Sequence, residues 1–158
     1  MADPVFIIDG DNVVHARGPV TDHERSREAL VADVSGWAAR SGVRVVVVLD
    51  GHGGDRRIGA CQVRYSRRET ADTVIERLAY REAAGGEVTV VSSDSVIRHV
   101  TQRREVSVMS AREFADRLAS SAPPGGTERS PGQRVRYQLA DALDPAVREA
   151  LERLRRNQ

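Results

Sequence analysis

Three short runs rich in valine and isoleucine, interrupted only by Thr89, each end abruptly in a polar segment. They span residues 5–8, 45–49 and 88–91, and they lead into Asp9, Asp50 and the segment 92–94. Nearly continuous apolar runs of this length are typical of strands that are buried on both faces of a parallel sheet. The intervening segments carry apolar residues at helical spacing. Strands that alternate with helices in this way predict an α/β fold with right-handed crossovers.

Capping residues and glycines set the expected element boundaries. Thr21 and Glu24 form a capping-box pattern, as do Ser110 and Glu113, and Gly42 stands where a helix C-terminal glycine belongs. We therefore expect helices at 21–42, 70–84, about 95–103 and from 110 onward, strands at 5–8, 43–49, 87–91 and 105–109, and a short edge strand near 61–65. Together they predict a three-layer α/β/α arrangement with a mainly parallel central sheet.

A Pro-, Gly- and Ser-rich stretch interrupts this pattern after residue 121. We expect an α/β domain at 1–121, a connector at 122–134 and a C-terminal helical tail at 135–158, where Asp144-Pro145 has the pattern of a helix start. The tail helix has an apolar face, and two readings stay open: it packs on the domain or it serves a partner.

Composition excludes several classes of protein. The net charge of +1 argues against a uniformly basic surface for nucleic acid, although all 24 basic residues are arginine, which binds phosphate well. No apolar run reaches the roughly 18 residues that span a membrane. Cys61 is the only cysteine, so no internal disulfide is possible. A cytoplasmic location is the expectation.

Carboxylates gather at the expected carboxyl edge of the sheet. Asp9, Asp50 and Asp94 follow strands, and Asp72 lies in the first turn of a helix that could face the same edge. Ligands of open α/β folds bind at this edge, and converging carboxylates repel one another unless a cation neutralises them. Mg²⁺ or Mn²⁺ is therefore the expected cofactor. For any one of these acids alone, a helix cap or loop position is the competing interpretation.

Five short segments also resemble one family, in order and spacing, across residues 5–118. They are Ile7-Ile8-Asp9-Gly10-Asp11-Asn12-Val13-Val14, Leu49-Asp50-Gly51-His52, Glu69-Thr70-Ala71-Asp72-Thr73-Val74-Ile75-Glu76-Arg77, Ser92-Ser93-Asp94 and Ser110-Ala111-Arg112-Glu113-Phe114. The set is similar to the NYN-domain nucleases, relatives of the PIN-domain ribonucleases, and most of all to their YacP-like bacterial branch. One departure is Asp11, which stands where that family usually has tyrosine.

The resemblance implies a PIN-like sheet and a metal-dependent endoribonuclease. By position, Asp9, Asp72 and Asp94 match the acidic metal-binding residues of the family, with Asp50 as an additional member, and all four are the expected catalytic residues. Asn12 and Ser92 match polar positions beside the site. These residue types permit hydrolysis by a metal-activated water. The implied substrate is RNA. The resemblance to the YacP-like branch also allows messenger RNA as the target and the ribosome as a partner.

Other polar residues are candidates for contact with RNA. Ser93 and His52 follow strand ends, and Arg67 and Arg68 lie between Asp50 and Asp72 in the chain. Arginines on both sides of a scissile bond could bind phosphates. A loop histidine and a solvated basic face are the competing interpretations.

Two other functions stay open. Asp9-Gly10-Asp11 after a strand also fits the nucleophile motif of haloacid-dehalogenase-type phosphatases, but that class usually supplies a lysine and this chain has none. A non-catalytic RNA- or ribosome-binding module on a nuclease fold is the second alternative. The presence of every candidate acid argues against it, because a binding module does not need them.

Overall fold

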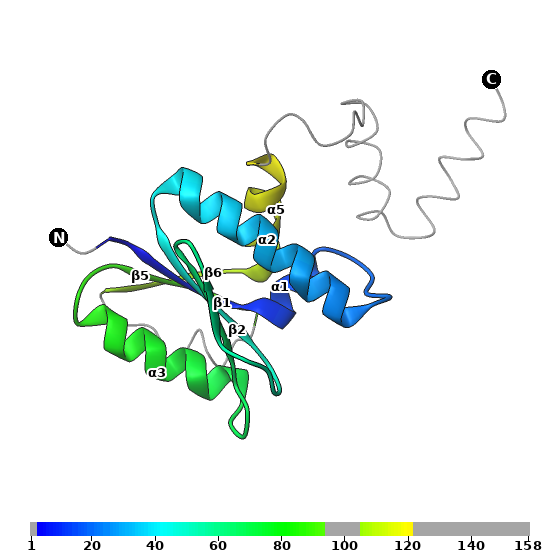
Figure 1. The fold of residues 1–158 in the computed structure, drawn as a ribbon. Helices are drawn as coiled ribbons and strands as arrows, with labels where there is room; N and C mark the ends of the chain where they lie inside the picture. Colours follow the sequence, from blue (N-terminus) through cyan, green and yellow to red (C-terminus); the bar gives the residue numbers. More distant parts are fainter. Residues whose placement is uncertain (1–2, 94–104, 122–158) are drawn as a thin grey trace, which may run out of the picture. The chain divides into compact units, whose positions relative to one another are not determined.

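A six-stranded sheet forms the centre of the computed structural model, which describes residues 3–93 and 105–121 (Figure 1). The strand order is β3-β4-β2-β1-β5-β6. The strands are β1 (Val5–Asp9), β2 (Arg44–Leu49), β3 (Arg56–Ile58), β4 (Cys61–Tyr65), β5 (Val88–Val91) and β6 (Val106–Met109). Only the pairing of β3 with β4 is antiparallel. The predicted mainly parallel sheet is confirmed.

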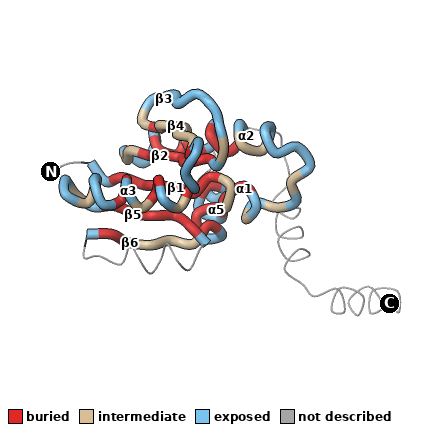
Figure 2. Tube along the Cα trace, turned by 90° about the horizontal axis from the view of Figure 1, so that it is seen from below, coloured by how far each residue is buried: buried red, intermediate tan, exposed pale blue. Residues whose placement is uncertain are grey.

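Helices cover both faces of this sheet. They are α1 (Gly10–Ala16), α2 (His23–Ser41), α3 (Ala71–Ala83) and α5 (Ala111–Ser120). Figure 1 shows α1, α2 and α5 on one face and α3 on the other. Two apolar clusters fill the two interfaces, the larger one around Trp37 and Phe114 and the smaller one around Ile75. The three-layer α/β/α arrangement is therefore confirmed, and the central strands β1, β2 and β5 are its most deeply buried part, whereas β3 is exposed (Figure 2).

The register of the parallel strands brings their carboxyl ends to one edge. Asp9 lies beside Val48 of β2, and Ile8 lies beside Val91 of β5. Gly10, which begins α1, lies so close to β2 that an added Cβ would meet Leu49 Cδ2 at 2.6 Å. This close approach holds α1 directly over the end of the sheet. The residues directly after β1, β2 and β5 therefore lie at the same edge.

The helix boundaries agree with the expected caps, with one correction. Ser110 Oγ accepts a hydrogen bond from the Glu113 N–H at 3.0 Å, and Gly42 ends α2 in the left-handed conformation at a φ of 65°. The N-cap of α2, however, is Asp22, whose carboxylate accepts the Arg25 N–H at 3.0 Å. The capping-box prediction that began this helix at Thr21 was wrong by one residue, because the Asp22 carboxylate accepts the free N–H of the first turn instead.

Two elements differ from the sequence-based expectations. The short helix α1 was not expected, and the strand at 61–65 is not an edge strand, because β3 pairs with it on its outer side. The expected helix at about 95–103, Asp94, the connector at 122–134 and the tail at 135–158 lie outside the described residues and stay predictions. Among the helices that are described, none is long and apolar enough to cross a membrane.

Candidate active site at the carboxyl edge of the sheet

Asp9 lies at the centre of the edge and is nearly enclosed. It is the last residue of β1 and the N-cap of α1, its residue exposure is 6%, and its carboxylate accepts the Asn12 N–H at 3.3 Å. Burial raises the pKa of Asp9 to about 6; the Asn12 hydrogen bond opposes this, and the charges of Asp72, Asp11 and Asp50 add to it. An acid in this setting favours a nearby cation.

Asn12 and Ser92 meet beside Asp9, as expected from the sequence. Asn12 Nδ2, in the first turn of α1, donates to Ser92 Oγ at 3.2 Å. Ser92 is fully buried at the end of β5, and its N–H donates to the Met109 carbonyl at 3.1 Å. This contact fixes the orientation of Asn12 across the gap between two strand ends. Ser93, the next residue, is exposed at the same edge.

Asp72 approaches the same centre from the other face of the sheet. It lies in the first turn of α3, which begins after the N-cap Thr70. Of the three acids whose charges raise the pKa of Asp9, Asp72 has the largest effect. The structure therefore brings together the acid that ends β1 and the acid at the start of α3, two residues 63 positions apart in the sequence.

Asp11 has a structural environment that the sequence did not indicate. Its carboxylate accepts hydrogen bonds from Arg27 Nε at 2.8 Å and Nη2 at 2.9 Å, and from the Asp50 N–H at 2.8 Å. His23 Nε2 lies 3.2 Å away. Burial opposes ionisation, but the Arg27 and Asp50 hydrogen bonds and the charges of Arg27 and His23 together hold the pKa of Asp11 below its ordinary value.

Asp50 is hydrogen-bonded into this second group, although its charge also adds to the raised pKa of Asp9. Its carboxylate Oδ1 accepts a hydrogen bond from Ser66 Oγ at 2.8 Å, and its carbonyl accepts one from Arg27 Nη2 at 2.8 Å. Arg27 thus links α1 to the end of β2. Sequence reasoning missed both Arg27 and Ser66. The i,i+4 spacing of His23 and Arg27 on one helix was the available signal, since both side chains reach Asp11.

The oxygen donors near Asp9 fit a hard divalent cation. Mg²⁺ requires only one or two direct carboxylates, with water completing its coordination, and the buried Asp9 has no cationic partner among the described residues. Within 3–93 and 105–121, no three histidine, cysteine, aspartate or glutamate side chains form a ready ligand set. Asp9 and Asp72 are the described residues that could hold the ion, and Asp94 lies outside that part of the chain.

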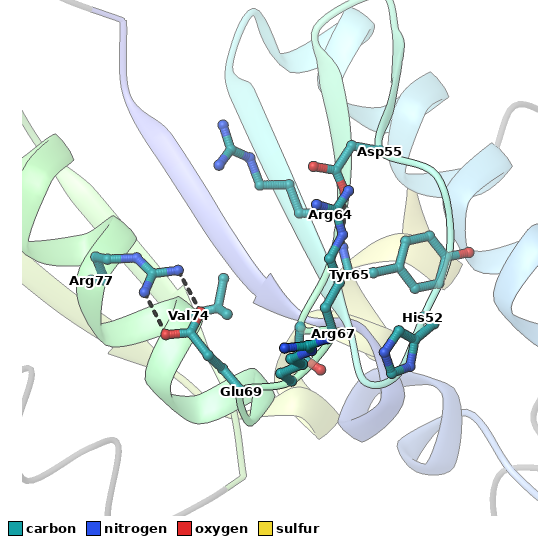
Figure 3. Close-up of a pocket in the computed structure, with 10 residues that line it drawn as sticks. His52, Asp55, Arg64, Tyr65, Arg67, Glu69, Val74 and Arg77 are labelled. Carbon is teal, nitrogen blue, oxygen red and sulfur yellow. Dashed lines mark hydrogen bonds and ion pairs between the residues drawn. The ribbon is translucent and has the colours of Figure 1, made fainter.

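His52, Arg67 and Arg68 come together in a pocket next to this edge (Figure 3). The pocket has a volume of about 480 Å³ and lies between the end of β4 and the start of α3. Ser66 lines it and also donates to Asp50, so the pocket borders the carboxyl edge. Three of the residues predicted to contact RNA therefore share one surface, separate from Asn12 and Ser92.

Comparison with known proteins decides the family. The profile of the YacP-like NYN domain matches residues 6–156. The chain belongs to the YacP-like NYN domain family. The match extends beyond the segments at 5–118 that carried the resemblance, and it takes in most of the C-terminal part of the chain.

Solved structures of this family have the same fold. The crystal structure of Rae1 (YacP) from Bacillus subtilis is 25% identical over 96% of this chain and 94% of that one, with a TM-score of 0.63. The W164L mutant of the same protein is 26% identical over 74% of this chain and 76% of that one, with a TM-score of 0.61. No curated protein sequence matches the chain. An NYN domain of this kind is a nuclease fold with an RNA-related function.

Proposed function

We propose that this protein is a metal-dependent endoribonuclease whose active site is the Asp9 edge of the sheet. The observation that carries the proposal is the enclosed Asp9 carboxylate, which has other carboxylates around it and no described cationic partner. A protein gains no stability from such a cluster by itself. The family and the fold support RNA as the substrate.

Each residue has a proposed task. Asp9 and Asp72 hold Mg²⁺ or Mn²⁺ together with Asp94, and Asp50 acts from outside through water. When bound, the ion activates a water and stabilises the leaving oxygen of an in-line displacement. In this proposal Asn12 donates to a phosphate oxygen; its hydrogen bond to Ser92 and the exposure of the neighbouring Ser93 support this role. The 2′-hydroxyl is not needed as nucleophile, so the product carries a 5′-phosphate.

Cleavage of a structured messenger RNA tests the proposal. In Mg²⁺ or Mn²⁺, Asp9→Asn and Asp72→Asn should each reduce the rate about 100-fold or more, because each removes a charge that positions the ion. Asp116→Asn is the matched control, since Asp116 is 66% exposed on α5, on the opposite face from α3. Product ends are assayed for a 5′-phosphate. Equal rates for wild type and Asp9→Asn would disprove the proposal.

The same assay with added ribosomes tests the proposed setting. Action on messenger RNA at the ribosome predicts cleavage that increases when ribosomes are present. Tight RNA binding without cleavage under either condition would favour the non-catalytic module. Phosphate release from a small phosphomonoester, with covalent labelling of Asp9, would favour the phosphatase.

A further inference from the structure

The pocket between β4 and α3 carries more positive charge than the rest of the site. Its lining includes four arginines and two acids, which gives a formal charge of 4 − 2 = +2 without His52. These charged residues are Arg64, Arg67, Arg68, Arg77, Asp55 and Glu69. A concave surface of one sign concentrates counter-ions of the other sign. The charge therefore favours an anionic ligand.

The four arginines are not equally engaged. Arg77 makes a two-bond ion pair with Glu69 at 2.7 and 2.8 Å, and Arg67 lies 3.6 Å from Asp55. Figure 3 shows Arg77 and Glu69 together on one side of the pocket, with Arg64 and Arg67 on the other. Neither Arg64 nor Arg68 has an ion pair with any described residue. Within the part of the chain that the structure describes, these two guanidinium groups have no ion-pair partner to lose when a ligand binds.

Arg64 is the most informative member, because it has a buried donor without an acceptor. The alternation of β4 puts Cys61 and Val63 in the apolar core under α2, so Arg64 projects from the opposite face, toward the side that carries α3. Its Nε is shielded from solvent and has no hydrogen-bond partner among the described residues. A shielded N–H without an acceptor carries a free-energy penalty in the folded protein. An oxygen of a bound anion would remove that penalty.

The backbone around the pocket is held in an uncommon conformation. Arg67 has a φ of 59°, the only positive value at a non-glycine residue in the described part of the chain. Its N–H donates to the Gly51 carbonyl at 2.7 Å, and the Gly51 N–H donates to Ser66 Oγ at 3.0 Å. Strained residues of this kind persist where the surroundings hold them, often at binding sites. The Arg67-Arg68 turn is therefore pre-organised at the rim.

The 51–54 loop closes the other wall. An added Cβ on Gly53 would lie 2.4 Å from Cζ of Tyr65, so the glycine allows the loop to lie directly against the tyrosine ring. His52 lines the pocket from this loop, and Tyr65 lines it from β4. The Tyr65 ring itself packs on the same side of β4 as Cys61 and Val63, against the apolar core, so His52 is the ring that lies beside the guanidinium groups. The hollow therefore suits a phosphate group, with one flat ring at its wall.

We propose that this pocket binds a backbone phosphate of single-stranded RNA at a position next to the cleaved bond, with Arg64 and Arg68 as its donors. The proposal rests on the proposed ribonuclease function and adds a substrate subsite to it. Arginine presents planar N–H groups that match phosphate oxygens. The Ser66–Asp50 hydrogen bond places the pocket at the border of the carboxyl edge, where the strand must pass.

The test measures binding in an Asp9→Asn background, so that RNA remains intact. A fluorescein-labelled 10-nucleotide single-stranded RNA of mixed sequence is titrated at several salt concentrations, and anisotropy gives Kd. Arg64→Met and Arg68→Gln should each weaken binding about 10-fold and reduce the slope of log K against log salt by about 0.7, the value for one phosphate contact on a single strand. Arg112→Gln is the control, because Arg112 is 68% exposed on α5, on the far face of the sheet.

Thermal unfolding separates this role from a structural one. Arg64→Met should keep or raise the melting temperature, because it removes the shielded unpaired N–H and nearly preserves side-chain volume. Lost RNA affinity at unchanged stability supports the subsite. A parallel drop in both would overturn it.

The outcomes distinguish this proposal from the function on which it rests. If both pocket variants bind RNA as tightly as their parent, the subsite is wrong, whatever the cleavage assay shows. If the variants lose affinity but wild type does not cleave RNA, the ribonuclease proposal fails. The pocket would then bind RNA, but it would not be a substrate subsite of a cleavage reaction. A polyglutamate peptide serves as a second anionic probe. If the two pocket variants lose binding to this peptide while their RNA binding is unchanged, the assignment of the pocket to RNA is overturned.

Discussion

The carboxyl edge of the sheet has two acidic halves with opposite electrostatics. On one side, Asp9 is enclosed with Asp72 nearby, its pKa is raised to about 6, and no described cation pairs with it. On the other side, Asp11 has its pKa held below the ordinary value despite burial, because Arg27 bonds it twice. Asp9 and Asp11, two positions apart, thus differ in effect. The Asp11 half stabilises the fold, whereas the Asp9 half lowers its stability, which indicates that Asp9 is there for a function.

Replacing Arg27 tests the stabilising half and should have the largest effect. Arg27→Met leaves the half-buried Asp11 carboxylate without its two-bond partner and frees the Asp50 carbonyl, so we expect a loss of about 3 kcal/mol in the free energy of unfolding. Urea unfolding at pH 7.5 measures it. Arg17→Met, which removes an exposed pair with Asp33, is the control and should lose less than about 1 kcal/mol.

A double variant sharpens the same test. Adding Asp11→Asn to Arg27→Met removes the unpaired charge, so part of the lost stability should return. If Arg27→Met is no more harmful than Arg17→Met, the Asp11 half does not stabilise the fold and the contrast between the halves is wrong.

Asp9 should behave in the opposite way in protein free of divalent metal. Its folded-state pKa of about 6 exceeds the ordinary 3.8, so the folded protein binds the proton more tightly. Below about pH 4 the Asp9 carboxyl is protonated in both states and does not lower the free energy of unfolding. As pH rises from about 4 through 6, its ionisation lowers that free energy by an amount that reaches about 3 kcal/mol. Asparagine keeps the N-cap without the charge. Asp9→Asn should therefore be more stable than wild type, with an advantage that grows by about 1 kcal/mol between pH 5 and 7.5.

Chemical unfolding in EDTA at several pH values measures this advantage. Added Mg²⁺ should then stabilise wild type more than Asp9→Asn, because only wild type keeps the full binding site. An advantage that is independent of pH would mean that Asp9 carries no electrostatic strain, and the two halves would no longer differ.

The sequence predicted the parts of this arrangement that depend on strand ends. Continuous apolar runs identified β1, β2 and β5, and parallel pairing placed Asp9, Asn12 and Ser92 at one edge. Helix α1 was missed because its seven residues follow β1 directly and leave no room for a helical pattern. Strand β3 was missed because its exposed sequence Arg56-Arg57-Ile58 has no strand pattern and is ordered by pairing with β4.

The division of the acids could not be predicted in the same way. It depends on how α2 crosses α1, because that crossing brings Arg27 to Asp11, 16 residues earlier in the chain. A pattern of strand ends gives the edge to which a carboxylate belongs, but not the side chains that face it. Asp50 was therefore grouped with Asp9 by position, and only its contacts with Arg27 and Ser66 distinguish it.

The smallest expected effect concerns Asp50, which lies at the border between the halves. Its carboxylate is held by Ser66, and its charge affects Asp9 less than the charges of Asp72 and Asp11 do. Asp50→Asn should therefore reduce RNA cleavage by about 10-fold or less, well short of Asp72→Asn. Ser66→Ala should lower the free energy of unfolding by about 1 kcal/mol, since the Gly51 N–H and Asp50 both lose a partner. If Asp50→Asn abolishes cleavage while Ser66→Ala leaves it unchanged, Asp50 belongs with Asp9, and the border between the two halves runs through Asp11 alone.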